Sequence, residues 1–121
     1  MTDIAFKKRV SVEEVEEGVT FQPKFDSNGL IPVITIEFET NEVLMHGYSN
    51  EEALRLTMST KKAHYFSRSR NELWEKGEIS GNFQKLKMLI PDCDKDTLLA
   101  VVEQIGVACH KGTWSCFNET V

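Results

Sequence analysis

A β-hairpin pattern in the first half of the chain sets the strongest limit on the fold. Residues 30–38 read LIPVITIEF, a run rich in β-branched and aromatic side chains. The following ETNE is typical of a turn, and VLMHGY at residues 43–48 resumes the extended pattern. Such side chains pack well on a pleated surface, so the two runs predict a pair of adjacent strands joined by the turn.

Two capping boxes predict helices on either side of this hairpin. Ser49 to Glu52 supplies a hydroxyl for the free N–H groups of a first turn and a carboxylate three residues later, and helix formers follow to about residue 60. Ser11 to Glu14 repeats the pattern, and Gly18 is suited to end a short helix.

The second half of the chain adds three further strand patterns. They lie at residues 63–69, 83–90 and 97–103, and a polar loop with glycines occupies residues 70–82. In the second of these strands we expect one face to carry Phe83, Leu86, Met88 and Ile90, and the other to carry Gln84, Lys85 and Lys87. No repeat or linker divides the chain, so residues 1–121 predict one compact α+β domain with a mainly antiparallel sheet and a few short helices.

Composition and charge narrow the class of protein. Hydrophobic residues make up 40% and charged residues 27% of the chain, as in proteins that fold. The N-terminus lacks the apolar core of a secretion signal, and no run has the length of a membrane span, so we expect a cytoplasmic protein. A net charge of −5 argues against a general nucleic-acid binder, and any recognition of phosphate must be local.

Three cysteines lie in the last third of the chain, at Cys93, Cys109 and Cys116. Reducing conditions keep thiols free, which favours metal binding or catalysis over disulfides. Three thiolates suffice to hold Zn²⁺ with its fourth position open for water. The alternative is that each cysteine is a small buried hydrophobe. His110 is a candidate fourth ligand, a candidate proton carrier or a packed histidine.

Three aspartates surround the first cysteine. If residues 92–96 are extended, Asp92, Asp94 and Asp96 point to one face and Cys93 to the other. Three adjacent carboxylates favour Mg²⁺ or Ca²⁺, although a solvated acidic turn is an equal alternative. An EF-hand is excluded, because Thr97 stands where that loop needs glycine and a strand pattern follows.

Basic residues gather between residues 61 and 87, which hold seven of the 14 lysines and arginines. Within this segment, hydroxyls, guanidinium groups, an aromatic plane and glycines outline a site for nucleotide phosphates. The alternative is a polar surface loop. The candidate substrate-binding residues are Arg68, Arg70, Trp74, Lys76, Ser80, Gly81 and Asn82.

Three segments in this order closely resemble the phosphoribosyl-AMP cyclohydrolase family of histidine biosynthesis. They are SRSRNELWEKGEISGN at 67–82, PDCDKD at 91–96 and ACHKGTWSCF at 108–117, and the resemblance runs from about residue 30 to 117. It implies a cytoplasmic homodimer with zinc on Cys93, Cys109 and Cys116, shared between subunits. It also implies magnesium on Asp92, Asp94 and Asp96.

The same resemblance implies the reaction. Zinc-activated water would attack C6 of the purine of 1-(5-phosphoribosyl)-AMP and open the ring at the C6–N1 bond, giving the formimino-aminoimidazole carboxamide ribonucleotide. His110 is our candidate for proton transfer. Two rivals are a zinc-stabilised dimeric binding module and a nucleotide deaminase, although the H-x-E and P-C-x-x-C segments of zinc deaminases are absent.

Overall fold

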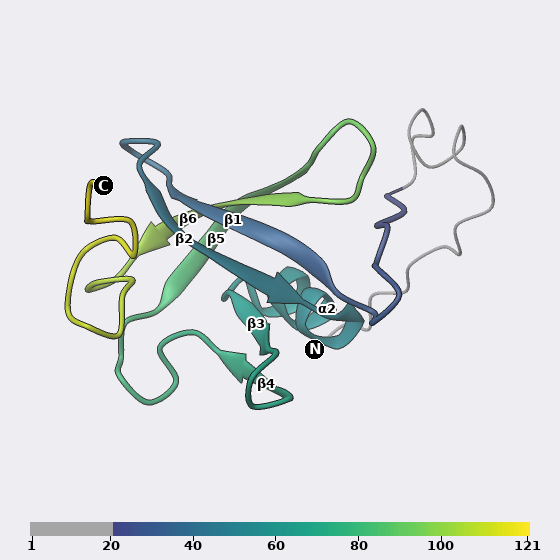
Figure 1. Ribbon diagram of the computed structural model, residues 1–121, viewed down its shortest axis with the longest axis horizontal. Helices are drawn as coiled ribbons and strands as arrows, with labels where there is room; N and C mark the ends of the chain where they lie inside the picture. Colours follow the sequence, from purple (N-terminus) through teal and green to yellow (C-terminus); the bar gives the residue numbers. More distant parts are fainter. Residues whose placement is uncertain (1–20) are drawn as a thin grey trace.

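The structure is a computed structural model that describes residues 21–121. Its elements, in chain order, are β1 (Ile31–Glu37), β2 (Val43–Ser49), α2 (Glu51–Thr60), β3 (His64–Ser67), β4 (Glu72–Glu75), β5 (Gln84–Pro91) and β6 (Leu98–Gln104) (Figure 1). The helix expected from Ser11 to Gly18 lies outside the described residues.

Four strands form the main sheet, in the order β2-β1-β6-β5. β1 pairs antiparallel with β2, so the expected hairpin is confirmed. On its other side β1 pairs in parallel with β6, and β6 pairs antiparallel with β5. The sheet is therefore mixed with a majority of antiparallel pairs, which agrees with an α+β domain.

Helix α2 begins one residue later than the capping box predicts. The N-cap is Asn50, whose side chain accepts a hydrogen bond from the backbone N–H of Ala53 at 2.8 Å, whereas Ser49 is the last residue of β2. Asparagine competes well with serine for this task, and only Asn50 stands where the backbone leaves the strand. Lys61 ends the helix in the left-handed conformation. None of the helical structure within residues 21–121 is long and apolar enough to cross a membrane.

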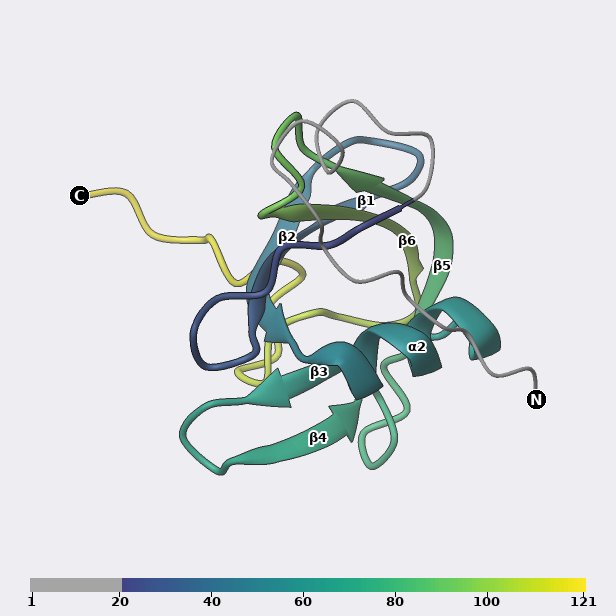
Figure 2. The ribbon, with the colours of Figure 1, turned by 90° about the vertical axis from the view of Figure 1, so that its right-hand side faces the viewer.

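A second, two-stranded sheet is formed by β3 and β4. β3 is the core of the strand expected at residues 63–69, but β4 lies within the segment expected to be a loop. Its sequence, ELWE, is too short and too polar to show a strand period, and it is extended because it pairs with β3. Figure 2 shows α2 and this hairpin together beneath the main sheet.

The expected assignment of faces in β5 is wrong. Gln84 is fully buried, whereas Met88 and Ile90 are 49% and 44% exposed. A bulge between Leu86 and Met88 shifts the register, which reverses the faces from that point on. Met88 and Ile90 consequently lie on the outer face of the sheet, away from α2.

The core lies between the sheet and the layer formed by α2 and β3. Leu54 of α2 and Tyr65 of β3 meet the inner side chains of the sheet, among them Ile31, Leu98 and Val102. The Tyr65 hydroxyl donates to Oε1 of Gln84 at 2.5 Å and lies 2.7 Å from Oγ1 of Thr35. Burial raises the pKa of Tyr65, so its hydroxyl stays protonated and available as a donor.

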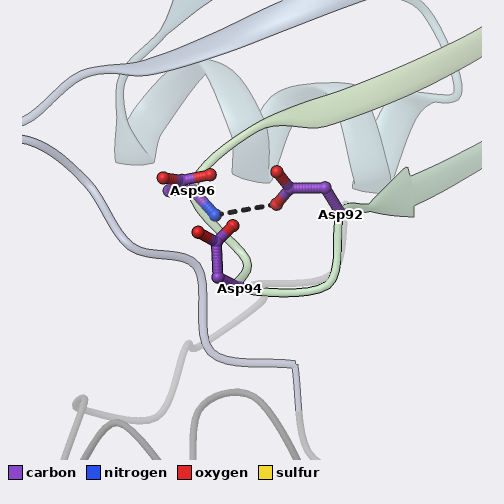
Figure 3. A group of neighbouring side chains, drawn as sticks. All are labelled: Asp92, Asp94 and Asp96. Atoms are coloured by element: carbon purple, nitrogen blue, oxygen red, sulfur yellow. Dashed lines mark hydrogen bonds between the residues drawn. The ribbon is translucent and has the colours of Figure 1, made fainter.

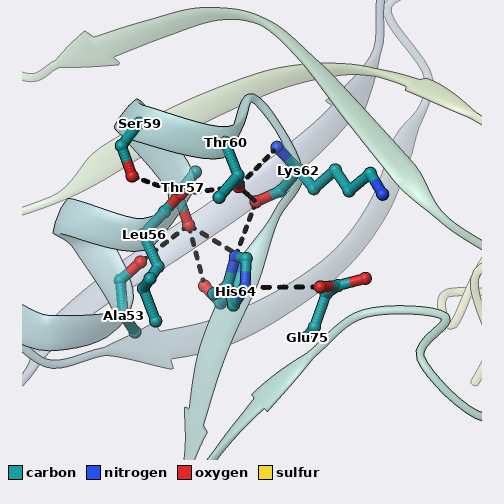
Figure 4. A network of polar contacts seen from close by, with 8 residues as sticks. All are labelled: Ala53, Leu56, Thr57, Ser59, Thr60, Lys62, His64 and Glu75. Atoms are coloured by element: carbon teal, nitrogen blue, oxygen red, sulfur yellow. Dashed lines mark hydrogen bonds and ion pairs between the residues drawn. The ribbon is translucent and has the colours of Figure 1, made fainter. Parts of the chain in front are cut away.

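His64 fastens the small sheet to the end of the helix (Figure 4). Its backbone N–H donates to Oγ1 of Thr57 at 2.9 Å, and its Nδ1 lies 2.7 Å from the carbonyl oxygen of Lys62. Its Nε2 faces Oε1 of Glu75 on β4 at 3.6 Å. These contacts fix the position of the residue that follows Glu75, which is Lys76.

Candidate active site

An open hollow of about 360 Å³ lies along β4 and the turn that follows it. Four of the expected substrate-binding residues line it, namely Arg70, Trp74, Lys76 and Ser80. The Arg70 guanidinium stands 5.7 Å from the centre of the Trp74 ring and 3.5 Å from Glu72. A flat aromatic surface beside two cations is suited to a phosphorylated base.

Arg68 lies apart from this hollow. Its guanidinium stacks on the Tyr48 ring at 4.0 Å. It lines a second open hollow, of about 410 Å³, together with Phe66 and the three asparagines Asn28, Asn50 and Asn71. Sequence reasoning missed Tyr48 and these asparagines, because they come from three separate segments and no local pattern connects them.

In the turn at residues 77–82, two backbone N–H groups donate hydrogen bonds to acceptors of the same turn. The N–H of Gly81 donates to the carbonyl oxygen of Gly77 at 2.8 Å, and the N–H of Asn82 donates to Oγ of Ser80 at 3.2 Å. The Asn82 side chain packs so close to Gly106 that a Cβ atom there would lie 2.0 Å from its Oδ1. Gly81 and Asn82 thus shape the turn, and Ser80 faces the hollow.

Two of the three cysteines meet in the loop after β6. The N–H of Cys116 donates to the carbonyl oxygen of Leu44 at 2.8 Å, and the N–H of Cys109 donates to that of Thr113 at 3.1 Å, so both ends of the loop are held. The two thiols interact, since each shifts the pKa of the other. The N–H of Lys111 contacts the Cys109 sulfur and lowers the pKa of that thiol, whereas burial and the neighbouring Cys109 raise the pKa of Cys116.

Lys76 joins the hollow to this thiol pair. Its Nζ donates to the carbonyl oxygen of Ala108 at 2.5 Å, one residue before Cys109. Burial lowers the pKa of Lys76, and the charges of Cys116 and Cys109 counteract that shift. The ammonium group is therefore part of the surroundings of both thiols. His110 is exposed on the same loop.

Cys93 lies far from the other two cysteines within one chain. It sits on the turn of residues 92–97 between β5 and β6, while the loop of residues 106–117 leaves the other end of β6 (Figure 1). β6 has seven residues, about 20 Å of extended chain, between the two positions. One copy of the described chain brings two thiols together, and not three.

The three aspartates do converge, though by a different route from the expected one (Figure 3). Residues 92–97 form a turn in which Lys95 adopts a left-handed conformation, and they are not extended. Oδ1 of Asp92 accepts from the N–H groups of Asp96 at 3.0 Å and of Thr97 at 3.2 Å. One potential ligand atom from each aspartate lies within 4.8 Å of the others.

The electrostatics of this cluster favour a cation. Contact with the Asp94 carboxyl, aided by Asp92, raises the pKa of Asp96 to about 6. The same contact with Asp96 lowers the pKa of Asp94. Oδ1 of Asp94 is shielded from solvent and lacks a hydrogen-bond partner. Hard oxygen donors at this separation, with one oxygen left over, fit Mg²⁺.

Comparison with known proteins agrees with these features. The family model described as phosphoribosyl-AMP cyclohydrolase matches residues 45–118. The phosphoribosyl-AMP cyclohydrolase of Bradyrhizobium diazoefficiens is 51% identical over 108 residues, which cover 89% of this chain and 77% of the relative. That of Archaeoglobus fulgidus is 58% identical over 94 residues, 78% of this chain and 87% of the relative.

A longer relative is also similar. The histidine biosynthesis bifunctional protein HisIE of Thermoanaerobacter pseudethanolicus is 55% identical over 105 residues, which are 87% of this chain and 49% of that protein. The α+β fold and these likenesses define the class, a hydrolytic enzyme. Within that class, the chain belongs to the phosphoribosyl-AMP cyclohydrolase family.

Proposed function

We propose that the protein opens the purine ring of 1-(5-phosphoribosyl)-AMP at the C6–N1 bond, as a cytoplasmic enzyme of histidine biosynthesis. The observation that carries the proposal is the Cys109–Cys116 thiol pair, which adjoins the hollow of Arg70, Trp74 and Lys76 in a chain of this family. The hollow offers surfaces for a base and its phosphates, and the thiols offer metal donors beside it.

In the proposed reaction, water adds to C6 and the C6–N1 bond breaks. One proton of the water ends on the exocyclic nitrogen, which is retained as a carboxamide, and the other ends on the released ring nitrogen. Trp74 would stack against the purine, while Arg70, Lys76 and Ser80 would hold phosphate oxygens. The exposed His110, on the thiol loop, would carry a proton between the water and nitrogen.

The substrate carries a second phosphoribosyl group, which calls for a second anion site. Arg68 and the asparagines of the 410 Å³ hollow supply a guanidinium and neutral donors for it. Gly81 and Asn82 would act through the shape of the turn that presents Ser80, since both backbone N–H groups are already bonded.

Zinc would be held by Cys109 and Cys116, together with Cys93 of a second copy. Soft thiolates suit Zn²⁺, and the first two cysteines belong to one loop that is hydrogen-bonded at both ends. When bound, zinc would supply Lewis acidity that activates water and stabilises negative charge on the oxygen that adds to C6. Since Cys93 lies at the other end of β6, the third thiol calls for a homodimer.

The outer face of the main sheet supports this dimer. His46, Ile34, Leu99 and Ile90 stand in one row across the four strands, and Val43, Ile36, Val101 and Met88 stand in the next. Ile34, Val43, Met88 and Ile90 are 36% to 49% exposed, a large apolar area for a sheet face in water. Two copies packed on this face about a twofold axis would bring each 92–97 turn toward the partner's thiol loop.

Magnesium would be held by Asp92, Asp94 and Asp96. Their converging oxygens and the unpartnered Oδ1 of Asp94 support this assignment. Because the turn that bears them also bears Cys93, the proposed dimer puts both metals near one substrate. Magnesium there would hold and orient phosphate groups.

The test is turnover of phosphoribosyl-AMP by purified protein loaded with zinc and supplied with Mg²⁺, with product absorbance and ammonia followed together. We expect ring opening without ammonia, lost in Cys109→Ser and retained in Lys85→Met on the exposed side of β5. Release of ammonia would replace the proposal with a deaminase, and an unchanged bound nucleotide would replace it with a binding module.

A further inference from the structure

We infer that Lys76 is a positioning residue for the Cys109–Cys116 thiol pair, because its ammonium group holds the backbone beside Cys109 and offsets the negative charge of two adjacent thiolates. The inference goes beyond phosphate binding by Lys76 and rests on the proposed function only in taking the thiols as metal donors. It assigns this lysine to the metal centre as well as to the hollow.

The position of Lys76 is fixed before its side chain reaches the thiol loop. Its backbone N–H donates to the carbonyl oxygen of Ala63 at 3.0 Å, and His64 ties the same end of the hairpin to α2. From there Nζ reaches the carbonyl oxygen of Ala108 at 2.5 Å, across 32 residues of sequence. A charge-assisted hydrogen bond delivered from a paired strand restrains the loop more than a contact from a free surface chain.

The charge of Lys76 matters because of what surrounds it. Cysteines bind zinc as thiolates, so a metal site on Cys109 and Cys116 gathers negative charge in this loop. The Lys76 ammonium group, held at the carbonyl oxygen of the residue before Cys109, puts a positive charge beside it.

Lysine is also better suited here than a neutral donor. A glutamine could bond the Ala108 carbonyl oxygen but would leave the two thiolates without a nearby cation. A methionine of similar length would lose both effects. The series Lys76→Arg, Lys76→Gln and Lys76→Met therefore separates the hydrogen bond from the charge, and Lys85→Met is a control that removes an exposed cation from β5.

The experiment is a metal titration of the intact protein without substrate. Zn²⁺ affinity is measured by competition with a chromophoric chelator, and Co²⁺ binding by its thiolate charge-transfer absorption. We expect Lys76→Met to weaken metal affinity about 10–100-fold, as loss of a contact that orients a ligand commonly does. The metal affinity of Lys76→Gln should lie between those of Lys76→Met and the unchanged protein. Lys76→Arg should recover most of the affinity, and Lys85→Met should have the affinity of the unchanged protein.

The absorption per bound Co²⁺ reports how many thiolates reach the ion, separately from how much metal is bound, and it is compared among variants that fold. We expect it to fall in Lys76→Met because fewer thiolates reach the ion. If Lys76→Met does not fold by circular dichroism, the decision passes to Lys76→Gln and Lys76→Arg. Equal metal affinity for those two would overturn the role of charge.

The outcomes separate this inference from the proposed activity. Unchanged affinity and absorption in Lys76→Met, with a raised KM for the nucleotide, would overturn the inference and leave Lys76 as a phosphate ligand. Weakened metal binding in a protein that never turns over phosphoribosyl-AMP would support the inference and refute the activity. Turnover by a protein without any thiolate absorption would overturn both the inference and the proposed zinc site.

Discussion

Two inactive variants of this protein should restore each other's activity when their subunits mix. Cys93→Ala removes the thiol of the 92–97 turn, and Cys109→Ala removes a thiol of the loop after β6. About 20 Å of strand separates the two positions in one chain, so a three-thiol site draws on two copies. A dimer with one subunit of each variant then keeps one complete three-thiol site, and its other site lacks the thiols of both Cys93 and Cys109.

The size of the recovery follows from the twofold symmetry. After random exchange of equal amounts, half of the dimers are mixed, and each has one of two sites intact. The mixture should therefore show about one quarter of the activity of the unchanged protein, and purified mixed dimers about one half. Each mixed dimer should also bind one zinc ion where the unchanged dimer binds two.

The assay uses two affinity tags to isolate the mixed dimers, followed by turnover and metal analysis. The matched control mixes Cys109→Ala with Cys116→Ala, whose lost thiols belong to the same loop. No combination of those two subunits contains a complete site, so the activity should stay absent. Mixed dimers of Cys93→Ala and Cys109→Ala that are equally inactive would refute the shared site.

Three further perturbations test the core, the acidic turn and the sheet face. Tyr65→Phe should lower the free energy of unfolding by about 2–4 kcal/mol in a urea titration, because Thr35 and Gln84 each lose a buried hydrogen-bond partner; a loss below about 1 kcal/mol would contradict this. Asp96 has a pKa raised to about 6, so without divalent metal its protonated form stabilises the fold fully below about pH 4, and this contribution is lost as the pH rises through 6. Thermal unfolding should show that loss in chelator and its reversal by Mg²⁺, and neither effect should remain in Asp96→Asn. Ile34→Glu should convert the proposed dimer to monomers in sedimentation experiments, since it puts a charge in the middle of the outer apolar rows. A dimer that stays intact would assign the interface to another surface.

The acidic turn shows how residues expected to lie together can do so through a different geometry. Alternation along an extended segment would point Asp92, Asp94 and Asp96 to one side. In the structure the segment turns, and the carboxylates meet because the Asp92 side chain accepts two backbone N–H groups across the turn. The composition of the segment left a cation site and a solvated acidic turn as equal alternatives, and it could not show the geometry of the carboxylates.

The sequence alone determined the elements whose causes are local. The β1–β2 hairpin follows from alternation and a turn within twenty residues, helix α2 from a capping pattern and helix formers, and β6 from a continuous apolar run. The segments that resemble the family could also be recognised, because a motif consists of residue types in a fixed order and the sequence contains both. These features depend on interactions between neighbours in the chain.

Only the tertiary structure decided how distant segments meet. The parallel pairing of β1 with β6, the strand β4 within an apparent loop and the bulge that turns Met88 and Ile90 outward each depend on partners far along the chain. The same is true of the 32-residue reach from Lys76 to Ala108 and of the separation of Cys93 from Cys109. Local preferences act over a few residues, whereas these contacts are selected by the free energy of the whole packed domain, which no single segment encodes.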